Sequence, residues 1–321
     1  MANIPSPRSS RRSNKRVAAR GEAGILALAR RYFAAGPACA PGVVCGIGDD
    51  AAVCRSPRAR WLELLTVDTL VAGTHFGPGT APTRIGWKAL AVNLSDIAAM
   101  GGIPTVAVVS VTLTGRETLA CVEALMQGMA AAARRFGVAI VGGDTVGGPA
   151  LSITVALAGR VEPRCVCYRS GAQPGDLIAV TGPLGGSLRS GRHLDFMPRL
   201  AEARWLVRHA KPTAMMDLSD GLAMDGNRLA LASKVALRLN ARAIPVSPGS
   251  TLAGALHDGE DFELLCTFAP AALTPRVRAA FARRFGRPLA LIGAVARPPV
   301  KVTVDGVALS SRGFDHFASA R

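Results

Sequence analysis

Six short segments rich in Gly, Ala, Ser and Thr hold ten of the 22 acidic residues of this chain. The net charge is +16, so acids gathered beside glycines are not ordinary solubilising charge. A single Asp in a turn is usually a backbone cap, but six such clusters require a shared cause. Converging carboxylates repel one another, whereas Mg2+ is held by a few carboxylates together with substrate phosphates. The pattern therefore predicts a multi-Mg2+ phosphate site. The segments are 46–53, 66–76, 93–101, 142–145, 216–221 and 258–261.

Size and composition narrow the class of protein. A chain of 321 residues is long enough for two domains, each with its own core. Hydrophobic residues make up 49% and aromatic residues only 5%, which predicts cores of Ala, Val and Leu. No apolar run approaches the roughly 18–20 residues of a membrane helix, so we expect no membrane partner. Seven scattered cysteines without a C-x-x-C pair favour a reducing, cytoplasmic location.

The positive charge is concentrated at the start of the chain. Residues 1–20 carry six basic residues and no acid, which predicts a disordered basic tail. An organelle transit peptide has a similar composition and stays an alternative. The remaining basic residues are spread out without interleaved aromatics or a known reader motif, so nucleic acid is not the predicted partner. Attraction of anionic phosphate substrates explains the charge better.

Hydrophobic periodicity predicts alternating strands and helices, and hence an α/β (α+β) fold. A cluster of Pro and Gly at 161–173 predicts a domain boundary, with domains at 21–162 and 163–321. The predicted helices cover 21–33, 83–100 (capped by Thr83 and ended by Gly101), 117–136 and 217–232. The predicted strands cover 61–67, 105–113, 138–141, 151–158, 177–181, 213–216, 263–268, 289–295 and 300–304, with a hairpin turn at Asp305-Gly306.

Two helices place polar residues where chemistry is expected. Within 83–100, Asn93 and Asp96 share a face, and Lys88 lies near it. A buried, Ala-rich helix needs partners for such groups, either as metal ligands or in a hydrogen-bond network. At the second helix, Asp217 suits an N-cap and Asp220 suits the helix dipole. A helix N-terminus also binds phosphate, so capping and function are compatible there.

The remaining motifs are weaker. The segment 182–187, Gly-Pro-Leu-Gly-Gly-Ser, resembles a phosphate loop only loosely, and the chain has no G-x-x-x-x-G-K-[ST] sequence. No Ser-His-Asp arrangement stands out. His75 alone among the histidines lies inside an acidic motif, where ligand contact and ordinary surface packing are both open.

Taken in order, the motifs resemble those of thiamine-monophosphate kinases, which belong to the AIR synthetase-like superfamily of ATP-binding enzymes. The resemblance runs from about residue 21 to residue 317. It implies a two-domain AIR synthetase-like fold whose N-terminal domain (21–162) forms a barrel in a homodimer, followed by a C-terminal domain (163–321). It also implies phosphorylation of thiamine monophosphate by ATP, through direct in-line transfer on a Mg2+ cluster. The motifs are GIGDDAAV, DTLVAGTHF, KALAVNLSDIAAMG, GGDT, DLSDGL and GEDFELL.

The same resemblance implies roles for particular residues. The implied metal ligands are Asp50, Thr66, Asp68, Asp96, Asp144, Asp217 and Asp220, of which Asp68, Asp96 and Asp220 are also the implied catalytic residues. The implied ATP contacts are Gly143, Asp144, Arg169 and Ser219. The implied contacts with thiamine monophosphate are His75, Glu260 and Phe314.

Three departures from the family pattern bear on the identity of the substrate more than on the binding of ATP and Mg2+. Val67 replaces a hydroxyl residue, which predicts a weaker metal site; the stretches 208–217 and 245–256 are short; and His257-Asp258 replaces small residues. Two alternatives follow: another superfamily enzyme, or a homologue that binds nucleotide without turnover. Selenophosphate synthesis would need a reactive cysteine near 21–33, which has none. Retention of six candidate metal aspartates argues against a binding-only protein.

Overall fold

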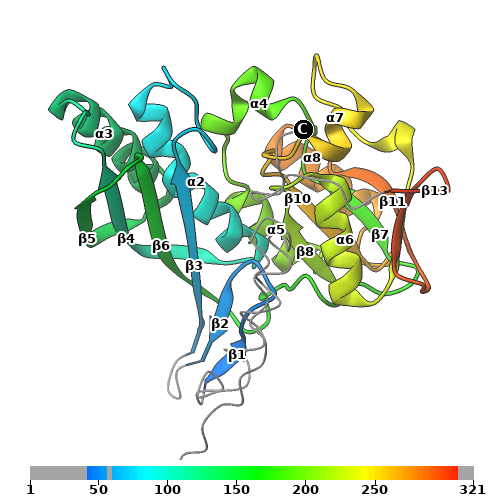
Figure 1. The fold of residues 1–321 in the computed structure, drawn as a ribbon. Coiled ribbons are helices and arrows are strands. Elements are labelled where there is room, and N and C mark those ends of the chain that lie inside the picture. Colours follow the sequence, from blue (N-terminus) through cyan, green and yellow to red (C-terminus); the bar gives the residue numbers. More distant parts are fainter. Residues whose placement is uncertain (1–41, 56–59, 310–321) are drawn as a thin grey trace, which may run out of the picture. The chain divides into compact units, whose positions relative to one another are not determined.

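The computed structural model describes residues 42–55 and 60–309. The predicted tail at 1–20, the predicted helix at 21–33 and Phe314 lie outside these residues. Within them the chain forms two sheets with accompanying helices, and the predicted α/β (α+β) class is confirmed (Figure 1).

The first sheet has six strands in the order β1-β2-β3-β6-β4-β5. Neighbouring strands are antiparallel except β4 and β5, which are parallel. Strand β5 is therefore an edge strand, and it extends well past the predicted 138–141, so the Gly142-Gly143-Asp144 motif lies inside the strand. The strands are β1 (Val43–Cys45), β2 (Ala52–Cys54), β3 (Leu62–Val71), β4 (Ile103–Leu113), β5 (Ala139–Gly147) and β6 (Ser152–Val161).

Two long helices, α2 (Pro82–Ala99) and α3 (Leu119–Phe136), pack together beside this sheet (Figure 1). Strand β3 alternates between buried Leu62 and Leu64 and exposed Leu65 and Val67, as a sheet with one covered face requires. Val67 therefore lies on the opposite face from Thr66 and Asp68. It lies on the same face of the sheet as Asp144 of β5, and the weakening of a metal site by Val67 stays a prediction.

Helix α2 is buried along most of its length because small Ala residues let neighbouring elements approach closely. The predicted cap at Thr83 is wrong: the helix begins at Pro82, and Ala81 precedes it without a side-chain cap. Proline fits the first helical turn, whose N–H groups have no helical partner anyway. The closest approach to α3 is at Gly86 and Gly128, where an added Cβ would lie 1.9 Å and 1.8 Å from a backbone oxygen of the other helix.

The second sheet has seven strands in the order β13-β12-β9-β11-β7-β10-β8, antiparallel except for β12 and β9. The predicted turn at Asp305-Gly306 joins β12 to β13, and both residues have the positive φ that a two-residue hairpin needs. The strands are β7 (Leu177–Val180), β8 (Ala214–Asp217), β9 (Ala236–Leu239), β10 (Leu264–Phe268), β11 (Ala290–Ala296), β12 (Lys301–Val304) and β13 (Val307–Ala308).

The predicted helix start at Asp217 is wrong. Asp217 is the last residue of β8, and helix α6 (Leu222–Ser233) begins after Gly221, which has φ 102° and gives no side-chain cap. The connecting segment leaves Asp220 just outside the helix. The sequence patterns did not predict β1, β2, β9, β13, α4 (Ser187–Ser190), α5 (Leu200–His209), α7 (Leu252–His257) or α8 (Pro275–Phe285).

Candidate functional site

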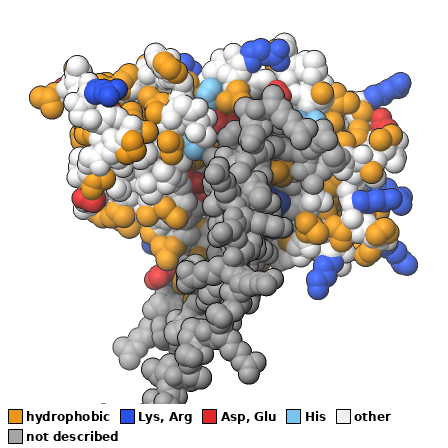
Figure 2. Space-filling model, viewed as in Figure 1, with side chains coloured by type: hydrophobic (Ala, Val, Ile, Leu, Met, Phe, Trp, Pro, Cys, Tyr) orange, Lys and Arg blue, Asp and Glu red, His pale blue; other side chains and the backbone are white. Residues whose placement is uncertain are grey.

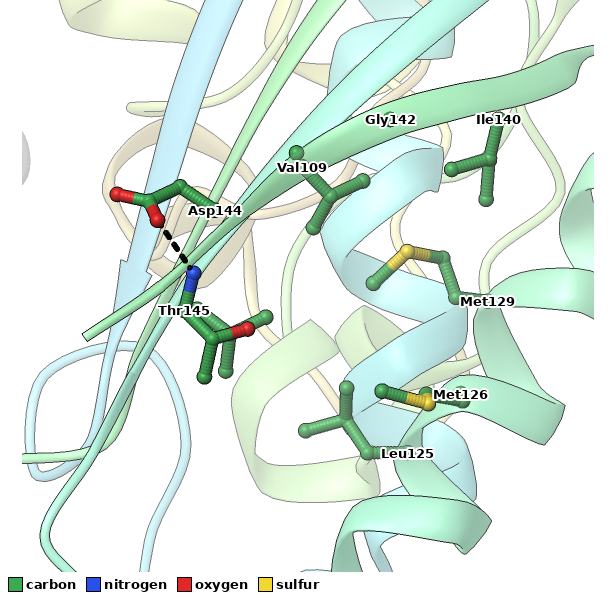
Figure 3. Close-up of a pocket in the computed structure, with 10 residues that line it drawn as sticks. Val109, Leu125, Met126, Met129, Ile140, Gly142, Asp144 and Thr145 are labelled. Carbon is green, nitrogen blue, oxygen red and sulfur yellow. Dashed lines mark hydrogen bonds between the residues drawn. The ribbon is translucent and has the colours of Figure 1, made fainter. Parts of the chain in front are cut away.

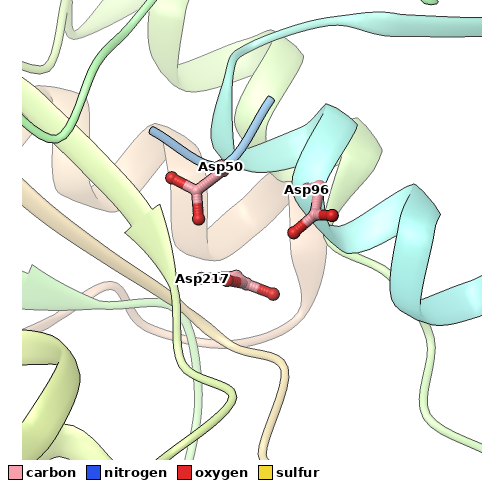
Figure 4. A group of neighbouring side chains, drawn as sticks. All are labelled: Asp50, Asp96 and Asp217. Carbon is pink, nitrogen blue, oxygen red and sulfur yellow. The ribbon is translucent and has the colours of Figure 1, made fainter. Parts of the chain in front are cut away.

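Three carboxylates from separate parts of the chain meet where α2 faces the edge of the second sheet. Asp50 lies in the loop before β2, Asp96 on α2 and Asp217 at the end of β8 (Figure 4). One carboxylate oxygen from each lies within 4.8 Å of the other two. Asp50 and Asp217 are buried, with 8% and 3% exposed. The sequence predicted all three, and the fold brings them together.

These carboxylates are electrostatically unfavourable on their own. Burial raises the pKa of Asp96 well above its usual range, and the charges of Asp68, Asp217 and Asp50 raise it further. Burial and the nearby Asp50 do the same to the pKa of Asp217. Oxygen ligands of this kind suit a hard divalent cation, which would remove the repulsion. The donor set therefore fits Mg2+.

Each of the three carboxylates accepts a hydrogen bond from a side chain of the protein. The Arg169 guanidinium donates two hydrogen bonds to Asp50, at 3.0 and 2.7 Å. The Ser95 hydroxyl donates to Asp217 at 2.6 Å, and the Thr66 hydroxyl donates to an Asp96 oxygen. A carboxylate has about four lone-pair positions, so further acceptor capacity remains at each.

Asp68 and Asp220 lie next to this group. Burial raises the pKa of Asp68, a hydrogen bond with Asp96 opposes this effect, and the charges of Asp220 and Asp50 add to it. Asp220 is held by the Arg228 guanidinium, which also donates to Asp225 at 2.8 Å. Burial and Asp220 raise the pKa of Asp225 to about 7.

Asp144 stands apart from the three-carboxylate group. It is exposed on β5, where its Oδ1 accepts a hydrogen bond from Thr145 N at 2.9 Å. With Gly142, Gly143 and Thr145 it lines a cavity of about 440 Å³ between β4, β5 and α3 (Figure 3). The other walls are apolar: Val109, Val111, Leu125, Met126, Met129 and Ile140. The roles of Gly143 and Asp144 stay predictions.

The predicted substrate contacts His75 and Glu260 are linked by a buried lysine. Lys88 Nζ lies 2.5 Å from Glu260 Oε2 and donates to the His75 carbonyl at 3.0 Å. His75 Nδ1 accepts from Val71 N at 3.0 Å. The Ser219 carbonyl accepts from Glu260 N at 2.6 Å, so the predicted Ser219 is in the same region. Phe314 lies outside the described residues.

Sequence reasoning missed Ser95, Asp225 and Arg228. Ser95 precedes the predicted Asp96 on a buried helix, and a hydroxyl there signals a polar partner. Asp225 and Arg228 are spaced i, i+3 on α6, which predicts a pair on one helix face. That spacing does not indicate that Arg228 also contacts Asp220.

Comparisons with known proteins bear directly on this geometry. Residues 48–161 match the family described as AIR synthase related protein, N-terminal domain. Thiamine-monophosphate kinase from Salmonella typhimurium is 35% identical over 326 residues, covering 92% of this chain and 99% of the relative. This chain belongs to the thiamine-monophosphate kinase family.

Solved structures agree. The structure of AaThiL complexed with AMPPCP and TMP matches with a TM-score of 0.79 at 28% identity, covering 95% of this chain and 99% of that one. Thiamine-monophosphate kinase from Stenotrophomonas maltophilia matches with a TM-score of 0.71 at 34% identity, covering 88% and 96%. The predicted family and AIR synthetase-like fold are confirmed. None of the helices in 42–55 and 60–309 combines the length and hydropathy that a bilayer crossing requires.

The repulsion in the carboxylate group predicts a pH-dependent stability. Because the folded-state pKa of Asp96 is raised, the folded protein holds this proton more tightly than the unfolded chain. The free energy of unfolding therefore falls as the pH rises from about 3.9, the pKa of Asp in the unfolded chain, through the raised pKa of Asp96 in the folded protein. We expect Asp96→Asn to raise the Tm of the metal-free protein at pH 8 by roughly 2–4 °C, about 1 kcal/mol, with the difference shrinking toward pH 4.

Differential scanning calorimetry in EDTA, followed by Mg2+ titration, measures this effect. Mg2+ should raise the Tm of the parent protein more than that of Asp96→Asn. The matched control is Asp144→Asn, an exposed carboxylate, which should leave the metal-free Tm unchanged. A lower metal-free Tm for Asp96→Asn at pH 8 would contradict the electrostatic argument.

Proposed function

We propose that this chain phosphorylates thiamine monophosphate to thiamine diphosphate with ATP. Family membership over nearly the full length of its relative supports the activity. The observation that carries the proposal is the buried group of Asp50, Asp96 and Asp217, which suits chemistry between two polyanions. Phosphoryl transfer needs positioning and charge compensation more than a covalent nucleophile.

In this proposal Asp50, Asp96 and Asp217 hold Mg2+, assisted by Asp68 and Asp220. Bound Mg2+ supplies positive charge that compensates the phosphate oxygens and orients them for in-line displacement. A phosphate oxygen of thiamine monophosphate attacks the γ-phosphorus of ATP. The new P–O bond forms as the bond to the departing ADP oxygen breaks. Thr66 keeps Asp96 in place through its hydroxyl.

We infer that the adenosine part of ATP enters the cavity along β5. Its walls of Val109, Leu125 and Met129 are apolar and suit the faces of a heteroaromatic ring. Gly143 and Asp144 line the same cavity, which supports their predicted role as ATP contacts. Arg169 then provides a guanidinium next to the carboxylate group, where it suits a phosphate.

We also propose a homodimer formed through the uncovered face of the first sheet. Directly paired residues place side chains on one face: Leu65, Ala158 and Val106 form one row. Val67, Ala156 and Val108 form the next. Val67 is 61% exposed and Leu65 51%. Figure 2 shows hydrophobic side chains over the part of the molecule occupied by these strands. A contiguous, exposed apolar face of this kind typically marks a surface at which a protein binds a partner.

The activity is tested directly by incubating the purified protein with ATP, Mg2+ and thiamine monophosphate and measuring thiamine diphosphate and ADP by chromatography. Equal amounts of both products are expected. Thiamine and inorganic phosphate serve as alternative acceptors. ATP binding in calorimetry without any thiamine diphosphate would favour the nucleotide-binding homologue, and turnover with another acceptor would favour a different superfamily enzyme.

If ATP binds in this cavity, a larger side chain there should weaken ATP binding without weakening thiamine monophosphate binding. Met126 lines the cavity from α3 and is 57% exposed, so Met126→Trp should fold while narrowing the cavity. We expect the KM for ATP to rise roughly tenfold, as expected for steric exclusion worth about 1.4 kcal/mol, with the KM for thiamine monophosphate little changed. Leu231→Trp, a comparable change at a side chain that is also 57% exposed but lies on α6 outside the cavity lining, is the matched control. Equal effects of both variants would contradict this assignment.

The dimer predicts that charge on the uncovered face separates the protomers. Val67→Lys should shift the protein from dimer to monomer in analytical ultracentrifugation, because an unpaired ammonium in an apolar interface is costly. Leu231→Lys, a comparable change at a side chain 57% exposed on α6, should leave the dimer intact. A parent protein that sediments as a monomer at micromolar concentration would overturn the proposal.

A further inference from the structure

Lys88 is the most unusual side chain outside the carboxylate group. It lies on α2 with none of its surface exposed, among the largest fully buried side chains described. Burial lowers the pKa of its ammonium, and the charge of Glu260 opposes that change. A buried charge is retained only when it is paired. Its two acceptors are Glu260 Oε2 and the His75 carbonyl, which come from distant parts of the chain.

Glu260 is held in a demanding backbone conformation. Its φ is 55°, in the left-handed region that non-glycine residues rarely adopt. Its N–H donates to the Ser219 carbonyl at 2.6 Å. Gly259 precedes it with φ 71°, and a Cβ there would lie 2.7 Å from the same carbonyl oxygen. Such conformations persist when the surroundings fix them, and they concentrate at ligand sites.

The other side of this loop is fixed to the same helix. Phe262, with φ 50°, stacks on Phe196 with ring centroids 4.0 Å apart. Trp87, next to Lys88 on α2, donates its indole N–H to the Phe196 carbonyl at 3.1 Å. Lys88 therefore contacts the loop directly and Trp87 contacts it through Phe196, and both lie on the helix that carries Asp96.

The pairing leaves one oxygen of Glu260 for a ligand. Lys88 binds Oε2, and Oε1 has no hydrogen-bond donor within 42–55 and 60–309. The side chain of Glu260 is 19% exposed. Burial and the charge of Lys88 lower the pKa of the neighbouring His193, whose Nδ1 lies 3.1 Å from the Ser187 carbonyl oxygen. Since the ion pair is neutral overall, Glu260 offers an oriented hydrogen-bond acceptor rather than a bare negative charge.

We propose that Lys88 is a positioning residue for substrate selection: it fixes Glu260 Oε2 so that Oε1 accepts a hydrogen bond from an N–H group on the heterocycle of the phosphate acceptor. This inference rests on the proposed function, in which that heterocycle is the aminopyrimidine of thiamine monophosphate. It differs from a simple cation-binding role for Glu260, because the nearby ammonium cancels the carboxylate charge.

The test compares steady-state kinetics with thiamine monophosphate and with oxythiamine monophosphate, in which an oxo group replaces the amino group. Lys88→Met removes the ammonium and keeps most of the side-chain length. We expect the KM for thiamine monophosphate to rise roughly tenfold or more, since the lost hydrogen bond involves a charged group, and the KM for ATP to change less than about twofold. The preference for the amino substrate over the oxo substrate should be lost.

Arg84→Met is the matched control. Arg84 lies one turn earlier on α2 and forms a solvent-exposed ion pair with Asp195, so its loss should leave both KM values and the substrate preference unchanged. Lys88→Met with normal substrate preference, or with equal increases in both KM values, would overturn the proposal. A parent protein that gives no thiamine diphosphate refutes the proposed function instead, before any variant is compared.

A double variant keeps the test decisive where Lys88→Met alone does not fold. Lys88→Met combined with Glu260→Gln leaves no unpaired buried charge. Because Lys88 acts through Glu260, the double variant should show the same KM for thiamine monophosphate as Glu260→Gln alone. A further increase in the double variant would show that Lys88 acts independently of Glu260 and would contradict the positioning role.

Discussion

The polar stripe on the buried helix α2 is the constraint on which the rest of the structure depends. Lys88, Asn93, Ser95 and Asp96 lie on a helix whose other buried residues are Ala, Val, Ile, Leu and Gly. Burying such groups is unfavourable unless each is paired. Ser95 donates a hydrogen bond to Asp217 at the edge of the second sheet, and Lys88 donates one to Glu260 in a later loop. One helix of the first half thus fixes where the functional residues of the second half must lie.

That arrangement places mutually repelling carboxylates close together at the site. The raised pKa values of Asp96 and Asp217 show that the folded protein holds carboxylates where the ionised form is unfavourable. A ligand that binds only the folded state returns stability through mass action. The free energy lost by gathering the acids is therefore available to strengthen cation binding. Arg169 forms an ion pair with Asp50, but the pKa values of Asp96 and Asp217 stay raised, so the protein alone does not remove the repulsion.

The sequence predicted the elements with strong local signals. The helix at 83–100 and the turn at Asp305-Gly306 follow from apolar periodicity and turn chemistry. The clusters of acids beside glycines predicted a shared Mg2+ site, and the family resemblance implied Asp50, Asp96 and Asp217 among its ligands. The local environment of Asp217 was not predicted: a residue between a strand and a helix fits either one. Pairs such as Lys88 with Glu260 are separated by most of the chain, and no spacing rule reports such tertiary contacts.

Strand β5 connects the two proposals that concern the first sheet. It is an edge strand with every residue exposed, and an uncovered edge invites pairing with another chain. The same strand supplies Gly142, Gly143 and Asp144 to the cavity. Glycines without side chains leave room for a ligand there but give the strand little packing of its own. A partner protomer on the neighbouring face would stiffen β5, so association and nucleotide binding should reinforce each other through the ordering of one strand.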